Sequence, residues 1–180
     1  MSDANVRLAR ADDAEAVQAI YAPEVIETPI TFEIEPPSVA EMRQRIEDTM
    51  RAHPWLVYDR DGTAIGYAYA TTHRSRAAYR WSVDVSVYVH RQARGIGVGR
   101  ALYAELLRLL RLQGFANAYA GITLPNAGSV ALHEAMGFQP VGVYHGVGFK
   151  LGAWHDVGWW ELALQPRAAS PAEPRPLPSL

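Results

Sequence analysis

β-Branched, aromatic and alternating apolar residues mark seven segments of the chain as β-strands. The predicted strands are NVRLARA at 5–11, WLVYD at 55–59, AIGYAYATT at 64–72, WSVDVSVYVH at 81–90, FANAYAGI at 115–122, VGVYHGVGFKL at 141–151 and VGWWELAL at 157–164. The turn RDG joins the second and third segments as a hairpin, and a polar stretch leads into the fourth. Three adjacent strands are therefore expected between residues 55 and 90.

Two capping patterns predict helices in the first fifty residues. Asp12 and Glu15 have the D-x-x-E spacing of a helix start and precede an apolar stripe, and this helix is predicted to end before Pro23. A short extended piece, ITFEI, and a Pro-Pro break follow. Ser38 and Glu41 then repeat the capping pattern ahead of VAEMRQRIEDTMRA, which predicts a second helix.

Glycines mark the ends of two further helices. Leucines at helical spacing predict a helix from about Gly99 to Gly114. A shorter helix is predicted to begin near Asn126 and to be closed by Gly137. This order of strands and helices is typical of a mixed α/β (α+β) fold.

Length and local composition define the domain. We expect one domain over residues 1–165, because 180 residues with 49% apolar side chains can bury a sizeable core. The remaining segment, 166–180, is rich in proline and poor in large apolar residues. That composition predicts a disordered tail without chemistry of its own.

Charge and cysteine content mainly exclude function classes. The net charge is −2, so the basic footprint expected of a nucleic-acid-binding protein is missing. The chain has no cysteine, which excludes disulfides, thiolate metal sites and a cysteine nucleophile. The first residues lack the apolar core of a signal peptide, and no apolar run approaches the roughly 20 residues of a membrane span. A cytoplasmic protein without a membrane partner is expected.

The segment RQARGIGVGR, residues 91–100, joins the fourth predicted strand to the leucine-rich helix. Its glycines let the backbone approach a ligand, and the first amides of the helix lack internal acceptors, so with three arginines the turn suits a phosphate. The P-loop pattern is absent, and the dinucleotide fingerprint begun at Gly95 meets Arg100. A tight strand-to-helix turn without a ligand remains the alternative at this point.

This strand–turn–helix unit, followed by the helix NAGSVALHEAMGF, resembles the GCN5-related N-acetyltransferases. Their pyrophosphate motif Q/R-x-x-G-x-G/A can be read from Gln92 or from Arg94, and the Arg94 register puts two glycines directly before the helix. The resemblance implies a central, mostly antiparallel sheet in which the strand ending near His90 and the one through 118–122 splay apart for the pantetheine arm of acetyl-CoA. The implied acetyl-CoA ligands are Val87, Tyr88, Val89, Arg94, Gly95, Ile96, Gly97, Val98, Gly99, Arg100, Asn126 and Ser129. Asn126 also has a sufficient structural role as a helix cap.

More narrowly, WSVDVSVYV, LPN, LHEAMGF and GFKLGAWHDVGWW look like the phosphinothricin and methionine sulfoximine acetyltransferase branch, over roughly residues 5–165. The branch implies an acetyl-CoA-dependent enzyme that acetylates the α-amine of a small amino-acid analogue. It also implies a homodimer and a role in herbicide resistance. The aromatic-rich segment AWHDVGWWELAL is consistent with a dimer, because it carries more apolar surface than one edge strand should expose.

Two residues are the catalytic candidates. Acetyl transfer to an amine requires a group that takes the amine's proton and a means of stabilising or protonating the CoA thiolate. Asp84 faces away from Val83 and Val85 on its strand and is the candidate base, although the branch carries a glutamate there, one methylene longer. His133 occupies the position where many relatives carry a tyrosine that protonates the thiolate. The alternatives are an ion-paired surface carboxylate for Asp84 and a hydrogen-bonded, half-buried side chain for His133.

A further set of residues is assigned to the acceptor. They are Phe32, Arg74, Arg76, Tyr79 and Val85. The arginine fork suits carboxylate and phosphinate oxygens, although ordinary solvated surface is the alternative for the arginines and the tyrosine. The other histidines, at positions 53, 73, 90, 145 and 155, are scattered without metal-ligand spacing, so no metal is expected.

Two other functions share the same turn. A catalytically inert acyl-CoA-sensing module would need the phosphate turn but not the pair of Asp84 and His133. An acetyltransferase of protein N-termini would keep the chemistry and change the acceptor. A serine hydrolase is disfavoured, because Ser129 in NAGSV does not satisfy G-x-S-x-G.

Overall fold

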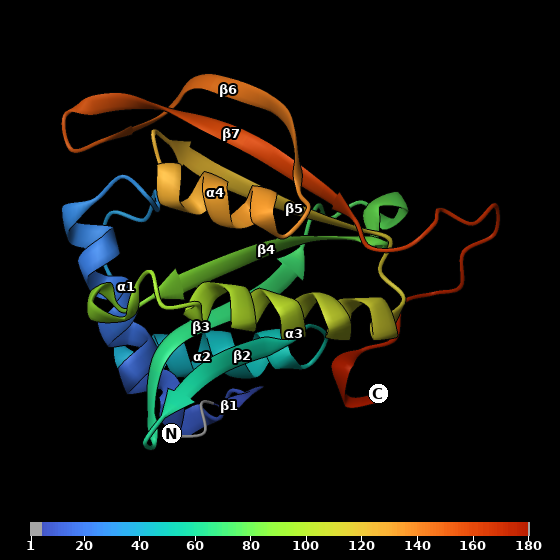
Figure 1. Ribbon diagram of the computed structural model, residues 1–180, viewed down its shortest axis with the longest axis horizontal. Helices are drawn as coiled ribbons and strands as arrows, with labels where there is room; N and C mark the ends of the chain where they lie inside the picture. The colour runs from blue at the N-terminus through green and yellow to red at the C-terminus, as the bar shows by residue number, and fades with distance from the viewer. Residues whose placement is uncertain (1–4, 180) are drawn as a thin grey trace.

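A computed structural model describes residues 5 to 179, which form one seven-stranded mixed sheet with order β1-β2-β3-β4-β5-β7-β6 (Figure 1). The strands are β1 (Asn5–Leu8), β2 (Trp55–Arg60), β3 (Thr63–Thr72), β4 (Ser82–Val89), β5 (Asn117–Leu124), β6 (Gln139–Lys150) and β7 (Ala153–Ala163). The helices are α1 (Ala14–Glu27), α2 (Val39–Met50), α3 (Val98–Gln113) and α4 (Ala127–Ala135), with short 3-10 turns η1 (Ala11–Asp13), η2 (Ala77–Tyr79), η3 (Arg91–Ala93) and η4 (Leu177–Ser179). The predicted mixed α/β fold is confirmed; positions 1–4 and 180 of the predicted domain and tail lie outside the described residues.

Two hydrophobic cores cover the two faces of the sheet. On one face α3 packs against inward residues of β3 and β4, including the fully buried Val83 and the 4% exposed Val85. On the other face α1 and α2 pack against Trp55, Val57 and Tyr67. Because side chains alternate along a strand, residues between the buried valines of β4 face the α1 and α2 side.

The prediction that the first helix ends before Pro23 is wrong: α1 continues through this proline to Glu27. A proline inside a helix removes one backbone hydrogen bond and costs about 3 kcal/mol. The turn that follows is nevertheless held, since Glu24 and Val25 are 2% and 1% exposed and the Thr28 hydroxyl donates to the Glu24 carbonyl at 2.7 Å. The capping prediction for the second helix is confirmed, with reciprocal Ser38 and Glu41 hydrogen bonds at the start of α2.

β4 and β5 form the parallel pair of this sheet, and they are hydrogen-bonded only at one end. Ser82, Val83 and Asp84 pair with residues 117–119, and beyond this point the two strands separate (Figure 1). The remaining half of each strand keeps its outer partner, β3 for β4 and β7 for β5. The predicted splay is therefore present, and it opens immediately after Asp84.

The proline-rich segment after residue 165, for which a disordered tail was predicted, contacts the end of α3. Its backbone packs across the end of α3, where the Arg175 amide donates to the Gln113 carbonyl at 2.7 Å and the Leu177 amide to the Ala52 carbonyl at 3.2 Å. The Gln113 side chain, 1% exposed, donates to the carbonyls of both Ala52 and Arg175. Proline-rich backbone still offers carbonyl acceptors, and a buried glutamine uses one of them here.

Candidate active site

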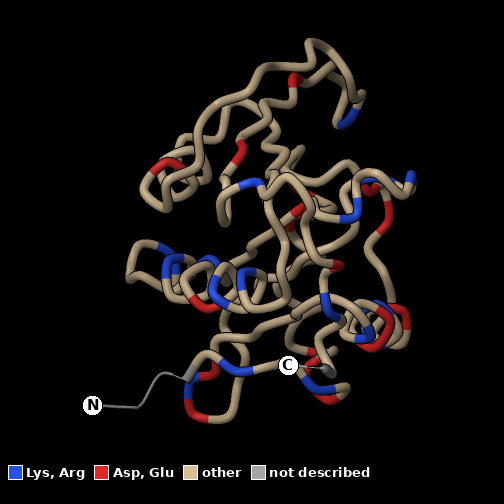
Figure 2. The backbone as a smooth tube through the Cα atoms, turned by 90° about the vertical axis from the view of Figure 1, so that its right-hand side faces the viewer, with Lys and Arg blue, Asp and Glu red and all other residues tan. Residues whose placement is uncertain are grey.

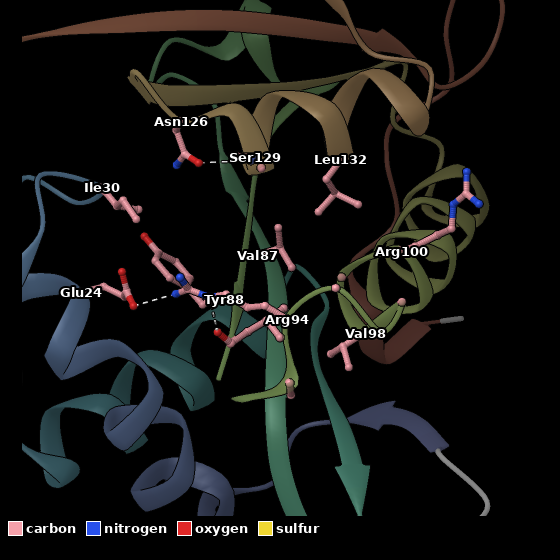
Figure 3. Close-up of a pocket in the computed structure, with 16 residues that line it drawn as sticks. Glu24, Ile30, Val87, Tyr88, Arg94, Val98, Arg100, Asn126, Ser129 and Leu132 are labelled. Atoms are coloured by element: carbon pink, nitrogen blue, oxygen red, sulfur yellow. Dashed lines mark hydrogen bonds and ion pairs between the residues drawn. The ribbon is translucent and has the colours of Figure 1, made fainter. Parts of the chain in front are cut away.

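A cavity of about 440 Å³ lies between the free end of β4, the glycine-rich turn and α4 (Figure 3). Its lining residues are Glu24, Ile30, Val87, Tyr88, Val89, Ala93, Arg94, Gly95, Gly97, Val98, Gly99, Arg100, Asn126, Gly128, Ser129 and Leu132. Every predicted acetyl-CoA ligand is among them except Ile96, whose side chain is 58% exposed. The residues that sequence reasoning missed are Glu24, Ile30, Ala93, Gly128 and Leu132.

The three glycines of the turn have different structural reasons. Gly95 and Gly97 have φ angles of 78° and 92°, in the left-handed region that favours glycine. Gly99 is already in α3, and a Cβ there would lie 2.9 Å from the side chain of Leu132 on α4. The turn thus presents the first amides of α3 to the cavity and lets α4 approach closely, which is the arrangement an anionic group needs.

A buried carboxylate holds the cations of this turn. Glu24, whose side chain is 3% exposed, accepts from Arg94 at 2.8 Å and from Arg91 at 3.3 Å, and Figure 3 shows the Arg94 contact. Arg91 also pairs with Glu27, and the Arg94 Nε donates to the Val89 carbonyl. Sequence reasoning missed Glu24 because the predicted helix ended before Pro23, and Glu24 lies beyond that end.

Asn126 closes the opposite wall of the cavity. Its Oδ1 accepts from the Ser129 amide at 3.1 Å and so caps α4, as predicted (Figure 3). The side-chain amide of Asn126 still has N–H donors, and the residue lines the cavity together with Ser129. A capping role and a ligand role are therefore compatible.

A narrow passage of about 50 Å³ continues from this cavity between the splayed strands. It is lined by Ile30, Val85, Ser86, Val87, Tyr88, Tyr103, Gly121, Ile122, Thr123, Asn126, Ser129 and His133. Both β4 and β5 contribute, together with α3 and α4. The passage shares Val87, Asn126 and Ser129 with the large cavity, and at its other end it reaches Val85, the neighbour of Asp84 on β4.

His133 is buried on the α4 side of the passage, 3% exposed, with both ring nitrogens hydrogen-bonded. Its Nδ1 lies 2.7 Å from the Ser129 carbonyl, which can only accept, so the hydrogen bonds assign the neutral tautomer protonated at Nδ1. The Nε2 then accepts from the Tyr103 hydroxyl at 2.8 Å. Burial lowers the pKa of His133 and raises that of Tyr103. A general-acid role would require the Nδ1 hydrogen bond to break, and it stays a prediction.

Asp84 lies at the inner end of the splay and is paired with a histidine. Its Oδ1 is 2.6 Å from Nδ1 of His73, and the two side chains are 28% and 13% exposed. Burial raises the pKa of Asp84, while the His73 hydrogen bond and the Arg74 charge oppose the rise. Sequence reasoning placed His73 among the scattered histidines; the register that pairs Thr71 with Asp84 is the signal that brings His73 within reach.

Two of the predicted acceptor residues gather around this pair. The Arg74 guanidinium lies 5.9 Å from the centre of the Trp159 ring and donates to the His73 carbonyl, and the Tyr79 ring is 5.8 Å from the His73 ring. Arg76 is exposed in the same turn, directly before η2. Val85 points to the other face, into the core and the passage.

Phe32 comes instead from the loop between α1 and α2. Its ring packs on Gly148 of β6, where a Cβ would lie 2.2 Å away, so any side chain at this position would displace the Phe32 ring. The loop is fixed on both sides: Lys150 Nζ donates to the Thr31 carbonyl at 2.7 Å, and Glu33 binds Arg45 through both oxygens.

Two general features bear on other kinds of site. Among residues 5 to 179, no three His, Cys, Asp or Glu side chains are close enough together to hold a metal ion. No helix in the same part of the chain has the length and apolarity needed to cross a membrane.

Known proteins resemble this chain over nearly its whole length. The acetyltransferase (GNAT) domain model matches residues 6–159. Phosphinothricin N-acetyltransferase of Streptomyces viridochromogenes is 38% identical over 172 residues, 96% of this chain and 92% of that protein. L-methionine sulfoximine/L-methionine sulfone acetyltransferase of Pseudomonas aeruginosa is 34% identical over 171 residues, 93% and 99% of the two chains.

The fold comparison agrees with the sequence comparison. The structure of a phosphinothricin acetyltransferase from Sinorhizobium meliloti in complex with acetyl-CoA matches with a TM-score of 0.90 at 38% identity, over 96% of this chain and 95% of that one. The resemblance noted in the sequence is confirmed, and an inert sensing module is not favoured. With its splayed sheet and glycine-rich turn, the chain belongs to the GNAT family and is an acetyl-CoA-dependent N-acetyltransferase.

Proposed function

We propose that this enzyme transfers the acetyl group of acetyl-CoA directly to the α-amine of a small amino-acid analogue such as phosphinothricin or methionine sulfoximine. The observation that carries the proposal is the cluster of Asp84, Arg74 and Tyr79 at the inner end of the splay, one strand residue from the passage. A carboxylate for the amine and arginines for acidic oxygens suit an amino acid with a second oxyanion. The names of the two relatives support the same class of acceptor.

The large cavity supports a specific arrangement of the co-substrate. The amides from Gly95 to Arg100 would bind the pyrophosphate, with Arg94 beside them. The unpaired edge of β4 at Val87–Val89 would hydrogen-bond the pantetheine amides in strand fashion, opposite Asn126 and Ser129. Ile96, the exposed residue of the turn, would contribute through its backbone.

In the proposed reaction Asp84 accepts a proton from the ammonium group of the acceptor, which frees the nitrogen lone pair. The nitrogen bonds to the acetyl carbon and the carbon–sulfur bond breaks, so no covalent enzyme intermediate is needed. His133 would stabilise or protonate the departing thiolate from Nδ1, the nitrogen that carries its proton beside the Ser129 carbonyl. Arg74, Arg76 and Tyr79 would hold the acid groups, with Phe32 and Val85 as apolar walls.

We also propose a homodimer in which the β6–β7 hairpin forms the contact. Exposed apolar side chains gather there: Val141, Val143, Tyr144, Val147, Phe149, Leu151 and Trp154, from 41% to 68% exposed. The hairpin carries only Lys150, Asp156 and Glu161 as charged residues, whereas Figure 2 shows both signs mixed along the helices. Such a patch marks an interaction surface. Light scattering at micromolar concentration should give twice the chain mass, and a monomer would reject this part of the proposal.

A cytoplasmic location and a role in resistance to phosphinothricin-type herbicides complete the proposal. The resistance role follows from the acceptor class. Expression of the chain in phosphinothricin-sensitive cells should permit growth, and Asp84→Asn should abolish the protection. Sensitivity that is unchanged by the wild-type chain, at confirmed expression, would reject the resistance role.

CoA-release kinetics over a panel of amines test the acceptor directly. The panel contains phosphinothricin, methionine sulfoximine, methionine sulfone, common amino acids, polyamines, aminoglycosides and a peptide with a free N-terminus. The highest kcat/KM is expected for one of the first three compounds. A best value on the peptide would favour a protein N-terminal acetyltransferase, and a best value on a polyamine or aminoglycoside would also reject the proposed acceptor class.

A further inference from the structure

His73 and Asp84 form a close pair, and the proposed reaction gives a role to Asp84 alone. The distance between Nδ1 and Oδ1 is 2.6 Å, within the range of a strong, charge-assisted hydrogen bond. The His73 ring is mostly buried and stacks on Tyr119 of β5 with ring centres 4.5 Å apart. The imidazole is therefore held in one place by a strand other than its own.

The position of the pair in the sheet connects it to the reacting atoms. Asp84 on β4 and Tyr119 on β5 are the last paired residues before the strands separate. His73 leaves the end of β3, hydrogen-bonds the first and stacks on the second. The pair thus spans the inner end of the splay, where an acceptor amine would meet the acetyl group emerging from the passage.

The charges around the pair are few. Arg74 is the nearest cation, and its guanidinium lies over Trp159. Two tyrosines contact the His73 ring: Tyr79 comes from η2, and Tyr119 comes from β5. The charge of Glu161 on β7 raises the pKa of Tyr119, and the charge of Arg167, after β7, lowers it. An imidazole is the side chain that ordinarily changes charge between pH 5 and 8, so it is the group here best suited to a proton at neutral pH.

We propose that His73 is a positioning residue for Asp84 and that the pair, rather than the carboxylate alone, holds the proton removed from the acceptor ammonium. The ammonium loses two protons when it becomes an amide. One ends on the thiol of CoA. The other is taken up at Nε2 of His73, because Nδ1 already donates its proton to the Asp84 carboxylate; the imidazole becomes an imidazolium and Asp84 stays ionised. Water takes that proton after turnover. The inference rests on the proposed function, but it needs only that the acceptor is an amine.

Two variants distinguish the two roles of His73, which are to hydrogen-bond the Asp84 carboxylate and to take up the proton. His73→Asn keeps an N–H donor near the position of Nδ1 but cannot titrate, whereas His73→Ala loses both properties. The readouts are kcat/KM for the best amine of the panel between pH 5 and 9, and the KM for acetyl-CoA. His53→Ala is the control, since His53 is also half-buried near β3 but contacts Thr72 and Phe115.

The expected pattern is specific. His73→Ala should lower kcat by about 10- to 100-fold, below the full general-base effect because Asp84 remains, with the KM for acetyl-CoA within about 2-fold. His73→Asn should recover part of kcat at high pH. In both variants the acid limb of the profile should move to lower pH, because a carboxylate alone titrates below an imidazole. His53→Ala should leave kcat and the acid limb of the profile unchanged.

Three outcomes would overturn the inference. They are an unchanged kcat in His73→Ala, an acid limb at the wild-type pH in both variants, or an acid limb at the wild-type pH in His73→Asn alone. If His73→Ala does not fold, His73→Gln replaces it, because its amide reaches past the Nδ1 position and does not reproduce that donor. Folding is checked by the rise in Tm with acetyl-CoA. A different best amine would change the proposed function and leave this test intact.

Discussion

The two sides of the splay hold their functional groups by different means. On the α3 side, the candidate phosphate ligands are mostly backbone amides, fixed by two glycines with positive φ and by the N-terminus of a helix. On the opposite side, the groups around Asp84 are side chains that hydrogen-bond or stack across β3, β4 and β5. Single side-chain replacements should therefore affect the chemical step on the Asp84 side, while added Cβ atoms should affect acetyl-CoA binding on the other.

Asp84→Asn should have the largest effect. The amide keeps the shape of the carboxylate but cannot take the amine's proton, so kcat should fall by about 10²- to 10⁴-fold. The KM for acetyl-CoA should stay nearly constant, because Asp84 does not line the large cavity. Steady-state kinetics with the best amine measure both, with Asp12→Asn, whose side chain is 95% exposed, as control. Wild-type turnover in the Asp84 variant would remove this residue from the mechanism.

Arg76→Ala should have the second-largest effect, and it should lower kcat/KM for the acceptor amine. A lost charge-assisted hydrogen bond costs about 1.5–3 kcal/mol, which lowers kcat/KM for the amine by roughly 10- to 150-fold. The matched control is Arg51→Ala, a 76% exposed arginine on the surface near α2. The proposed grip on the acid groups is wrong if kcat/KM for the best amino-acid analogue does not change.

Gly97→Ala tests the backbone side. The residue has φ of +92°, where a Cβ costs about 1–2 kcal/mol, so the turn should deform and acetyl-CoA should bind about 5- to 30-fold more weakly. The kcat at saturating acetyl-CoA should be unchanged. Isothermal titration measures the affinity, and Gly142→Ala, at an open position without positive φ, is the control. Equal affinity in the Gly97 variant would mean that the turn does not set the binding geometry.

Glu33→Gln should have the smallest effect. The side chains of Arg45 and Glu33 are 43% and 36% exposed, so loss of the pair should cost about 0.5–1 kcal/mol. The Arg45 hydrogen bonds lower the pKa of Glu33, so this stability is present above the range of free glutamate and is lost as pH falls through the lowered pKa. The Tm difference between wild type and variant should therefore stay constant from pH 7 to about pH 4.5 and shrink as the pH falls further. A difference that grows would contradict the pairing; Glu35→Gln is the control.

The glycine-rich turn was predictable from the sequence because its determinants are neighbours in the chain. Gly95, Gly97 and the residues of the α3 N-terminus act through local backbone geometry, and Asn126 caps α4 through the amide of Ser129, three residues later. The hairpin and the two later helices followed from equally local signals. These parts needed no knowledge of which segments meet in space.

The residues that were missed act across long sequence separations. Glu24 reaches Arg91 and Arg94 some 70 positions later, and the packing that carries α1 past Pro23 is tertiary. His73 meets Asp84 only through the antiparallel register of β3 and β4, and Tyr119 only through the parallel pairing of β4 and β5. Periodicity gives the faces of a strand but not its register, so these partners could not be named from the pattern.

The separation of the two sides is tested most directly by a double-mutant cycle. The measurement is kcat/KM for acetyl-CoA, at saturating amine, in wild type, Asp84→Asn, Gly97→Ala and the double variant. Independent sites should add, so the loss in the double variant should equal the sum of the single losses within about 0.5 kcal/mol. A deviation above about 1 kcal/mol would show that the turn and the base act as one unit, which contradicts the account.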